Sequence, residues 1–150
     1  MQVYIVLAVV LGVVLFLLTR KKSLPPIQTV GSIYEKEVTD ASFEQFVLQT
    51  SKNKPVMVDF YAKWCAPCLY LTPLLAEMAR DYDGAFLLAK IDTDANPRLK
   101  KQFNVAAIPT VMLFKDGEPV ERFSGGKMEH SIRYKLAEHD IMQPQAEVDA

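Results

Sequence analysis

The chain has 150 residues, which is enough for one domain and an extension. Its 17 Lys and Arg residues nearly balance its 18 Asp and Glu residues, and the globular part holds no basic block, so nothing predicts a nucleic-acid partner. Two cysteines do not make a disulfide scaffold, so cysteine usage alone does not fix the cellular compartment.

An unbroken apolar run extends from Val3 to Leu18 at the N-terminus. As a helix, this run with its flanking residues spans a bilayer core of about 30 Å. The alternatives are a buried core helix and a cleaved signal peptide. A signal peptide needs a basic start and a small-residue cleavage site, and the sequence has neither. We therefore predict an uncleaved transmembrane anchor at residues 1–19.

The charges that flank the run predict its orientation. Arg20, Lys21 and Lys22 follow the run, and no basic residue precedes it. The positive-inside rule then places the rest of a single-pass membrane protein in the cytoplasm. Because the rule is statistical, the opposite orientation, with the domain facing the periplasm or the cell exterior, stays open.

Residues 20–32 are predicted to be a linker, stiffened by Pro25-Pro26. The globular domain follows at residues 33–140, and residues 141–150 are predicted to be a flexible tail. A first short strand is expected at residues 33–38. Thr39 or Asp40 is expected to cap the next helix, whose apolar face consists of Phe43, Phe46 and Val47.

A strand at residues 55–61 leads into a helix that starts at Cys65. Pro73 lies inside this helix and predicts a kink, and Asp83-Gly84 ends it. Its apolar residues recur at three-to-four spacing, which is typical of an amphipathic helix: Leu71, Leu74, Leu75, Met78 and Tyr82.

The second half of the domain starts with a strand at residues 86–92 and a short helix capped by Asp94. Two strands at residues 111–114 and 120–123 flank an Asp-Gly turn, which indicates a hairpin. The last helix is expected to have one apolar face, formed by Met128, Ile132 and Leu136. The order βαβαβα then ββα predicts an α/β fold, with a mixed central sheet flanked by helices.

The two cysteines, Cys65 and Cys68, form a Cys-x-x-Cys motif directly after an apolar strand. At a helix N-terminus, free amides and the helix dipole favour a thiolate, which suits dithiol–disulfide exchange. A zinc site would need further ligands, but there is no second cysteine pair, and His130 and His139 are too far apart in sequence. A static disulfide that closes so short a loop would stabilise little. We predict no metal and no cofactor.

Three segments resemble the thioredoxin family, in its order and spacing, over residues 33–139. They are Val58-Asp59-Phe60-Tyr61-Ala62-Lys63-Trp64-Cys65-Ala66-Pro67-Cys68, Ile108-Pro109-Thr110 and Leu113-Phe114-Lys115-Asp116-Gly117. The resemblance implies the thioredoxin fold and a thiol–disulfide oxidoreductase. One departure is Ala66, where the family usually carries glycine.

Cys65 is the candidate nucleophile, because it stands at the helix start and is expected to be exposed. Cys68, one turn further and more buried, is the candidate resolving cysteine. Neither Ala66 nor Pro67 titrates, and this favours a reducing potential, nearer about −270 mV than about −120 mV.

Asp59 and Lys90 are charged residues within apolar strands. Burial would raise the pKa of Asp59 and make it a proton acceptor. The resemblance implies that Asp59 is the buried acid that relays a proton from Cys68, with Lys90 as its partner. The alternative is that both side chains point to solvent, as charged residues usually do.

The resemblance also implies a cis bond before Pro109, although most X–Pro bonds are trans. The backbone of Ile108 would then pair with an extended substrate segment. A substrate-binding rim of apolar and small residues would surround the cysteines, with simple core packing as the alternative for its tryptophan: Trp64, Ala66, Pro67, Ile108, Pro109, Gly125 and Gly126.

The sequence thus favours an enzyme that reduces disulfides in other proteins and is recharged by a dithiol electron donor, such as a reductase. The alternatives are a thioredoxin-fold binding module or co-chaperone, and an extracytoplasmic reductant of cytochrome or envelope thiols. A pure binding module has no need for both cysteines, Pro67, Asp59 and Lys90 together, and all of them are present.

Overall fold

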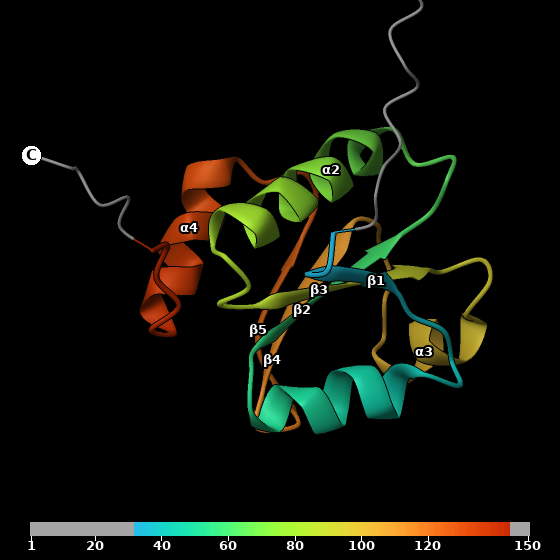
Figure 1. Ribbon diagram of the computed structural model, residues 1–150. Coiled ribbons are helices and arrows are strands. Elements are labelled where there is room, and N and C mark those ends of the chain that lie inside the picture. The colour runs from blue at the N-terminus through green and yellow to red at the C-terminus, as the bar shows by residue number, and fades with distance from the viewer. Residues whose placement is uncertain (1–31, 145–150) are drawn as a thin grey trace, which may run out of the picture. The chain divides into compact units, whose positions relative to one another are not determined.

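The computed structural model describes residues 32–144, which form a five-stranded sheet with the strand order β1-β3-β2-β4-β5 (Figure 1). The strands are β1 (Glu35–Glu37), β2 (Val56–Tyr61), β3 (Leu87–Asp92), β4 (Thr110–Lys115) and β5 (Glu118–Ser124). β3 pairs in parallel with β1 and β2, whereas β4 runs antiparallel to β2 and β5. The predicted mixed sheet is confirmed.

Helices cover both faces of the sheet (Figure 1). One face carries α2 (Ala66–Asp81) and α4 (Glu129–Glu138). The other face carries the π-helical segment η1 (Glu44–Gln49), the short 3-10 segment η2 (Thr50–Lys52) and α3 (Pro97–Gln102). The sheet is thus the middle of three layers.

Each face of the sheet has its own apolar core, because successive side chains of a strand point to opposite faces. Met57 of β2 packs in the core beneath α2 and α4, whereas Val58 and Phe60 pack in the core on the side of η1 and α3. Asp59 alternates with Val58 and Phe60, so it shares the face of Met57 and points toward α2. The alternation of side chains along β2 therefore places the Asp59 carboxyl on the face of the sheet that α2 covers.

Residues Asp116 and Gly117 make the tight turn between β4 and β5. Their φ angles of 55° and 84° lie in the left-handed region, which Gly adopts freely and Asp tolerates. The predicted hairpin is confirmed.

Of the predicted capping residues, Asp40 and Asp94 were wrong, whereas the Thr39 carbonyl accepts hydrogen bonds of 3.0 Å from the Ser42 and Phe43 amides at the start of the first helical segment. Asn96, not Asp94, occupies the N-cap position of α3. Asp40 does not cap the helix that follows it; its Oδ1 instead accepts a hydrogen bond of 3.1 Å from the Leu99 amide in the first turn of α3. Sequence signals for caps assume a neighbouring residue, whereas α3 takes its cap from a segment far away in the chain.

Met128 was also predicted wrongly, as part of the buried face of the last helix. Ile132 and Leu136 are buried there, but Met128 is 70% exposed. It precedes α4 at the N-cap position, in an extended conformation, so its side chain does not follow the helical spacing.

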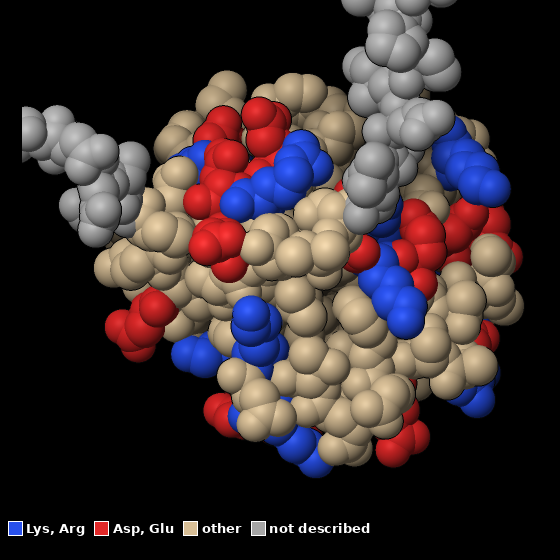
Figure 2. Space-filling model, in the orientation of Figure 1, with Lys and Arg blue, Asp and Glu red and all other residues tan. Residues whose placement is uncertain are grey.

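The anchor predicted at residues 1–19, the linker except Ser32, and residues 145–150 of the tail lie outside the described residues. Within residues 32–144, no helix combines the length and the apolar character that crossing a bilayer requires. On the face of the molecule seen in Figure 2, acidic and basic side chains are interspersed.

Candidate active site

Cys65 and Cys68 are joined by a disulfide at the N-terminus of α2, with their Cα atoms 5.3 Å apart. Cys65 is the N-cap residue, in an extended conformation, and its Sγ accepts a hydrogen bond of 3.3 Å from the Cys68 amide. The four residues between β2 and α2 thus place the Cys65 sulfur where unpaired helix amides stabilise negative charge.

Both cysteines are almost completely buried in this oxidised form, which corrects the prediction that Cys65 is exposed. The exposed fraction is 4% for Cys65 and 2% for Cys68. The two cysteines form a buried cluster with Ala62, and Tyr61 and Ile108 lie against this cluster. A partner molecule must therefore fit closely around the disulfide to reach it.

Trp64 lies beside the cysteines and is 70% exposed, so it is not a core residue. Its indole Nε1 donates a hydrogen bond of 2.7 Å to Asp94 Oδ2, from the loop after β3. This contact fixes a large apolar ring at the surface. Sequence reasoning had assigned Asp94 to a helix cap and missed its role here.

The loop before β4 also packs against the disulfide. The Ile108–Pro109 bond is cis, as the resemblance implies, and Ile108 packs against the cysteine cluster. The Gly125 amide donates a hydrogen bond of 2.8 Å to the Pro109 carbonyl. Space is open where a Gly126 side chain would stand, so the surface stays flat there.

Ala66 and Pro67 are exposed at the start of α2, next to Cys65. The same helix exposes Leu69 and Tyr70, at 69% and 65%, and sequence reasoning missed these two residues. Their signal was available, because they fall outside the buried stripe of Cys68, Leu71 and Leu75. The disulfide thus lies within an apolar surface.

Asp59 is fully buried beneath α2, which excludes the alternative that it points to solvent. Thr72 Oγ1 donates a hydrogen bond of 2.5 Å to Asp59 Oδ2, while Oδ1 has no partner among residues 32–144. Burial raises the pKa of Asp59 from its ordinary value of 3.8 to about 6, and the bond from Thr72 offsets part of this shift.

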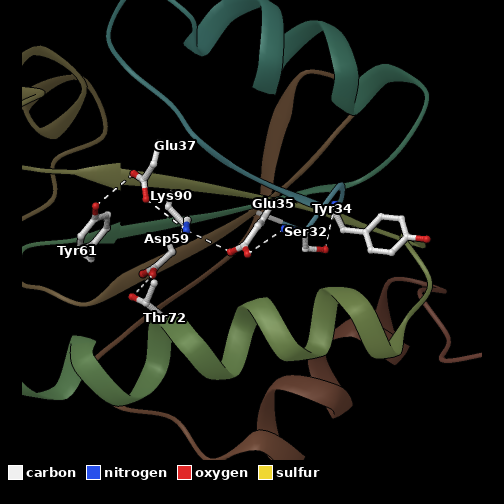
Figure 3. A network of polar contacts seen from close by, with 8 residues as sticks. All are labelled: Ser32, Tyr34, Glu35, Glu37, Asp59, Tyr61, Thr72 and Lys90. Carbon is white, nitrogen blue, oxygen red and sulfur yellow. Dashed lines mark hydrogen bonds and ion pairs between the residues drawn. The ribbon is translucent and has the colours of Figure 1, made fainter. Parts of the chain in front are cut away.

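Lys90 is the neighbour of Asp59 in the parallel pairing of β2 and β3, but its ion pairs go elsewhere (Figure 3). Its Nζ lies 3.1 Å from Glu35 Oε2 and 3.3 Å from Glu37 Oε1, both on β1. Burial acts to lower the pKa of Lys90, but the two carboxylates outweigh it and the pKa rises. Within residues 32–144, no ion pair joins Lys90 to Asp59, but the charge of Lys90 still acts to lower the pKa of Asp59.

Sequence reasoning missed Glu35 and Glu37. The alternation Glu35-Lys36-Glu37 was a signal, because it puts both carboxylates on one face of β1. Among the described residues, no group of His, Cys, Asp and Glu side chains is arranged to hold a metal ion.

The family model for thioredoxin matches residues 35–138, which reach from the first residue of β1 to the last of α4. The thioredoxin of Mycobacterium tuberculosis (strain ATCC 25618 / H37Rv) is 46% identical over 102 residues, which cover 68% of this chain and 86% of that protein. Thioredoxin 1 of Nostoc sp. is 38% identical over 103 residues, 69% of this chain and 94% of that protein.

A relative with two activities in its name also matches. It is the bifunctional thioredoxin reductase/thioredoxin of Mycobacterium leprae, 45% identical over 102 residues, which cover 68% of this chain and 22% of that protein.

We predict that Asp59→Asn stabilises the oxidised full-length protein at neutral pH but not in acid. Since folding raises the pKa of Asp59 from 3.8 to about 6, the native state holds the proton more tightly, and the parent loses stability as pH rises through this window. The asparagine variant has no such loss. The difference in free energy of unfolding between the variant and the parent should therefore increase by about 2 to 3 kcal/mol from pH 4 to pH 7.

Urea denaturation of both proteins across this pH range measures the difference. Glu118→Gln, which removes an exposed carboxylate, is the matched control and should follow the parent at every pH. Parallel curves for the parent and Asp59→Asn would show that Asp59 titrates normally.

Proposed function

Since this chain belongs to the thioredoxin family and is a thioredoxin-type thiol–disulfide oxidoreductase, we propose that its working direction is the reduction of disulfides in other proteins. The observation that carries the proposal is the Cys65–Cys68 disulfide, closed at a helix N-terminus within an apolar surface. That state is the product expected after one round of substrate reduction.

The reaction has two exchange steps. The Cys65 thiolate attacks one sulfur of the substrate disulfide, the substrate S–S bond breaks, and the released substrate thiolate takes up a proton. Cys68 then loses its proton and attacks the Cys65 sulfur, so the mixed disulfide breaks and the second substrate thiol leaves. The two electrons come from the dithiol, which becomes the Cys65–Cys68 disulfide.

Asp59 is proposed as the acceptor of the Cys68 proton. Cys68 and Thr72 are four residues apart on α2 and share one face of the helix, and Thr72 bonds to Asp59. The Asp59 carboxyl therefore lies on the side of α2 that carries Cys68. A group whose pKa is about 6 is well matched to taking and returning a proton near neutral pH.

The substrate is proposed to lie across the rim, between Trp64 on one side and Ile108 on the other. Ala66, Pro67 and the two glycines, Gly125 and Gly126, leave the surface flat enough for an extended segment. The Ile108 backbone would pair with that segment, and apolar contact with Trp64 would add affinity.

The electrons for the next cycle are proposed to come from a dithiol reductase. The relative from Mycobacterium leprae, whose name joins a thioredoxin reductase to a thioredoxin, supports a donor of this kind. The chemistry needs no cofactor on this chain, because the cysteines carry both electrons.

Residues 1–19 are proposed to anchor the protein in a membrane. The support is the apolar run from Val3 to Leu18, and Arg20, Lys21 and Lys22 after it favour a cytoplasmic domain. In this arrangement the reductase and the substrates are cytoplasmic.

We predict that full-length Cys65→Ser does not reduce insulin disulfides with a dithiol donor, because the attacking thiolate is gone. Cys68→Ser should instead accumulate mixed disulfides with substrates, visible on non-reducing gels and linked through Cys65. Parental activity in Cys65→Ser would contradict the enzyme mechanism, and trapping by Cys65→Ser alone would reverse the two roles.

We predict that Asp59→Asn slows the second exchange step by about 100-fold, within the usual contribution of positioned proton transfer. Stopped-flow measurement of mixed-disulfide decay reports this step, whereas formation of the mixed disulfide should stay at the parental rate. Glu118→Gln should leave both steps unchanged. An undiminished decay rate in Asp59→Asn would rule out the relay.

We predict that a membrane-impermeant thiol reagent leaves Cys65 unlabelled in intact, reduced cells and labels it after lysis. Labelling in intact cells would place the domain outside and favour envelope or cytochrome thiols as substrates. Extraction of the protein without detergent would contradict the anchor.

A further inference from the structure

A row of alternating charges crosses the three parallel strands (Figure 3). In the register of the sheet, Glu37 of β1 stands beside Lys90 of β3, and Lys90 stands beside Asp59 of β2. The next position in the row, on β4, is the apolar Val111. Lys90 thus has an acid on either side, and only one of these acids is fully buried.

The Lys90 ammonium is held on the side of β1. Its Nζ contacts Glu37 and also Glu35, two residues earlier on the same face of the strand. These distances, 3.1 and 3.3 Å, are those of direct ion pairs. Two carboxylates therefore compete with Asp59 for one cation, and they hold it.

The two carboxylates are themselves fixed by their other oxygen atoms. Glu35 Oε1 accepts a hydrogen bond of 3.4 Å from the Ser32 amide, and Glu37 Oε2 accepts one of 3.2 Å from the Tyr61 hydroxyl. Tyr61 lies against the cysteine cluster. Glu37 therefore connects Lys90 to the wall of the active site, and neither carboxylate is free to follow Lys90 toward Asp59.

We propose that Glu35 and Glu37 are positioning residues for proton transfer at Asp59: they hold the Lys90 ammonium at the β1 edge and so keep its charge from the buried carboxyl. The inference rests on the proposed relay, and it names the residues that regulate it. With a cation in direct contact, Asp59 would stay ionised and would be a poor acceptor of the Cys68 proton.

The charged and polar groups around Asp59 act on its pKa in opposite directions. Glu35 and Glu37 come from β1, Lys90 from β3 and Tyr61 from β2, while α2 contributes Thr72 and, in the reduced protein, Cys68. After burial and the Thr72 hydrogen bond, the largest influences on the pKa of Asp59 are Glu37, which raises it, and Lys90, which lowers it.

The test is a titration of Asp59 in the oxidised full-length protein, followed by the chemical shift of its carboxyl carbon. Glu35→Gln combined with Glu37→Gln releases Lys90, so the Asp59 midpoint should fall by about one pH unit, as a nearby cation typically causes. Glu44→Gln combined with Glu118→Gln changes the net charge equally at exposed positions without ion pairs in the described part of the chain, and should leave the midpoint in place. A shift no larger than in this control would overturn the proposal.

A second comparison separates positioning from direct repulsion. In a Lys90→Met background, the Glu35→Gln and Glu37→Gln substitutions should lose most of their effect on the Asp59 midpoint. An undiminished effect would mean that the carboxylates act on Asp59 directly, and positioning of Lys90 would be refuted. If the double variant does not fold, Glu37→Gln alone is the substitute, because the Glu37 side chain is 58% exposed and its replacement should be tolerated. This single variant should shift the Asp59 midpoint in the same direction by a smaller amount. An unchanged midpoint there would also overturn the proposal.

The titration needs no turnover, so its outcome is independent of the proposed relay. A parental rate of mixed-disulfide decay in Asp59→Asn would refute the relay, while a lowered midpoint would still establish that Glu35 and Glu37 control the charge around Asp59.

Discussion

The short connection from β2 to α2 is the constraint on which the rest of the site depends. Four residues, 62–65, join the end of a buried strand to the start of a helix that packs across the same sheet. Cys65 is therefore fixed at the helix N-terminus, and the helical repeat then puts Cys68 and Thr72 on the face toward Asp59. A thiolate site and a buried acid follow from one local geometry.

Burial of Asp59 is costly, and the surrounding packing has to offset it. The pKa of Asp59, about 6 instead of 3.8, corresponds to about 3 kcal/mol of destabilisation when the carboxyl is ionised. Met57 and Leu88 lie fully buried nearby in the same core, and burying each such side chain contributes about 1.5 to 3 kcal/mol. A few apolar neighbours thus suffice to keep an acid in the interior, where we propose that it serves proton transfer.

The sequence predicted those features that depend on neighbouring residues. Leu71, Leu75 and Met78 marked α2 by their spacing, and Asp116-Gly117 marked the hairpin by its turn chemistry. The features that depend on remote segments could not be read in this way. Asp40 caps α3 and Asp94 holds Trp64, and in both cases the partner belongs to another part of the chain. The exposure of Cys65 was misjudged for the same reason, because Ile108 covers it from the loop before β4.

The ion pairs of Lys90 show that the strand register, and not the composition, determines which charged residues become neighbours. In the sequence, nothing distinguishes Glu35 and Glu37 from solvent-exposed charged residues. Asp59 and Lys90, in contrast, match the buried acid and the lysine partner of the thioredoxin family. Only the parallel register of β1 on β3 sets Glu37 beside Lys90, and a slip by one residue would turn both carboxylates to the opposite face. Lys90 lies between the carboxylates of β1 and the carboxyl of Asp59, and it pairs with those of β1. We therefore infer that the charge state of Asp59 depends on β1, an edge strand of three residues that carries neither cysteine.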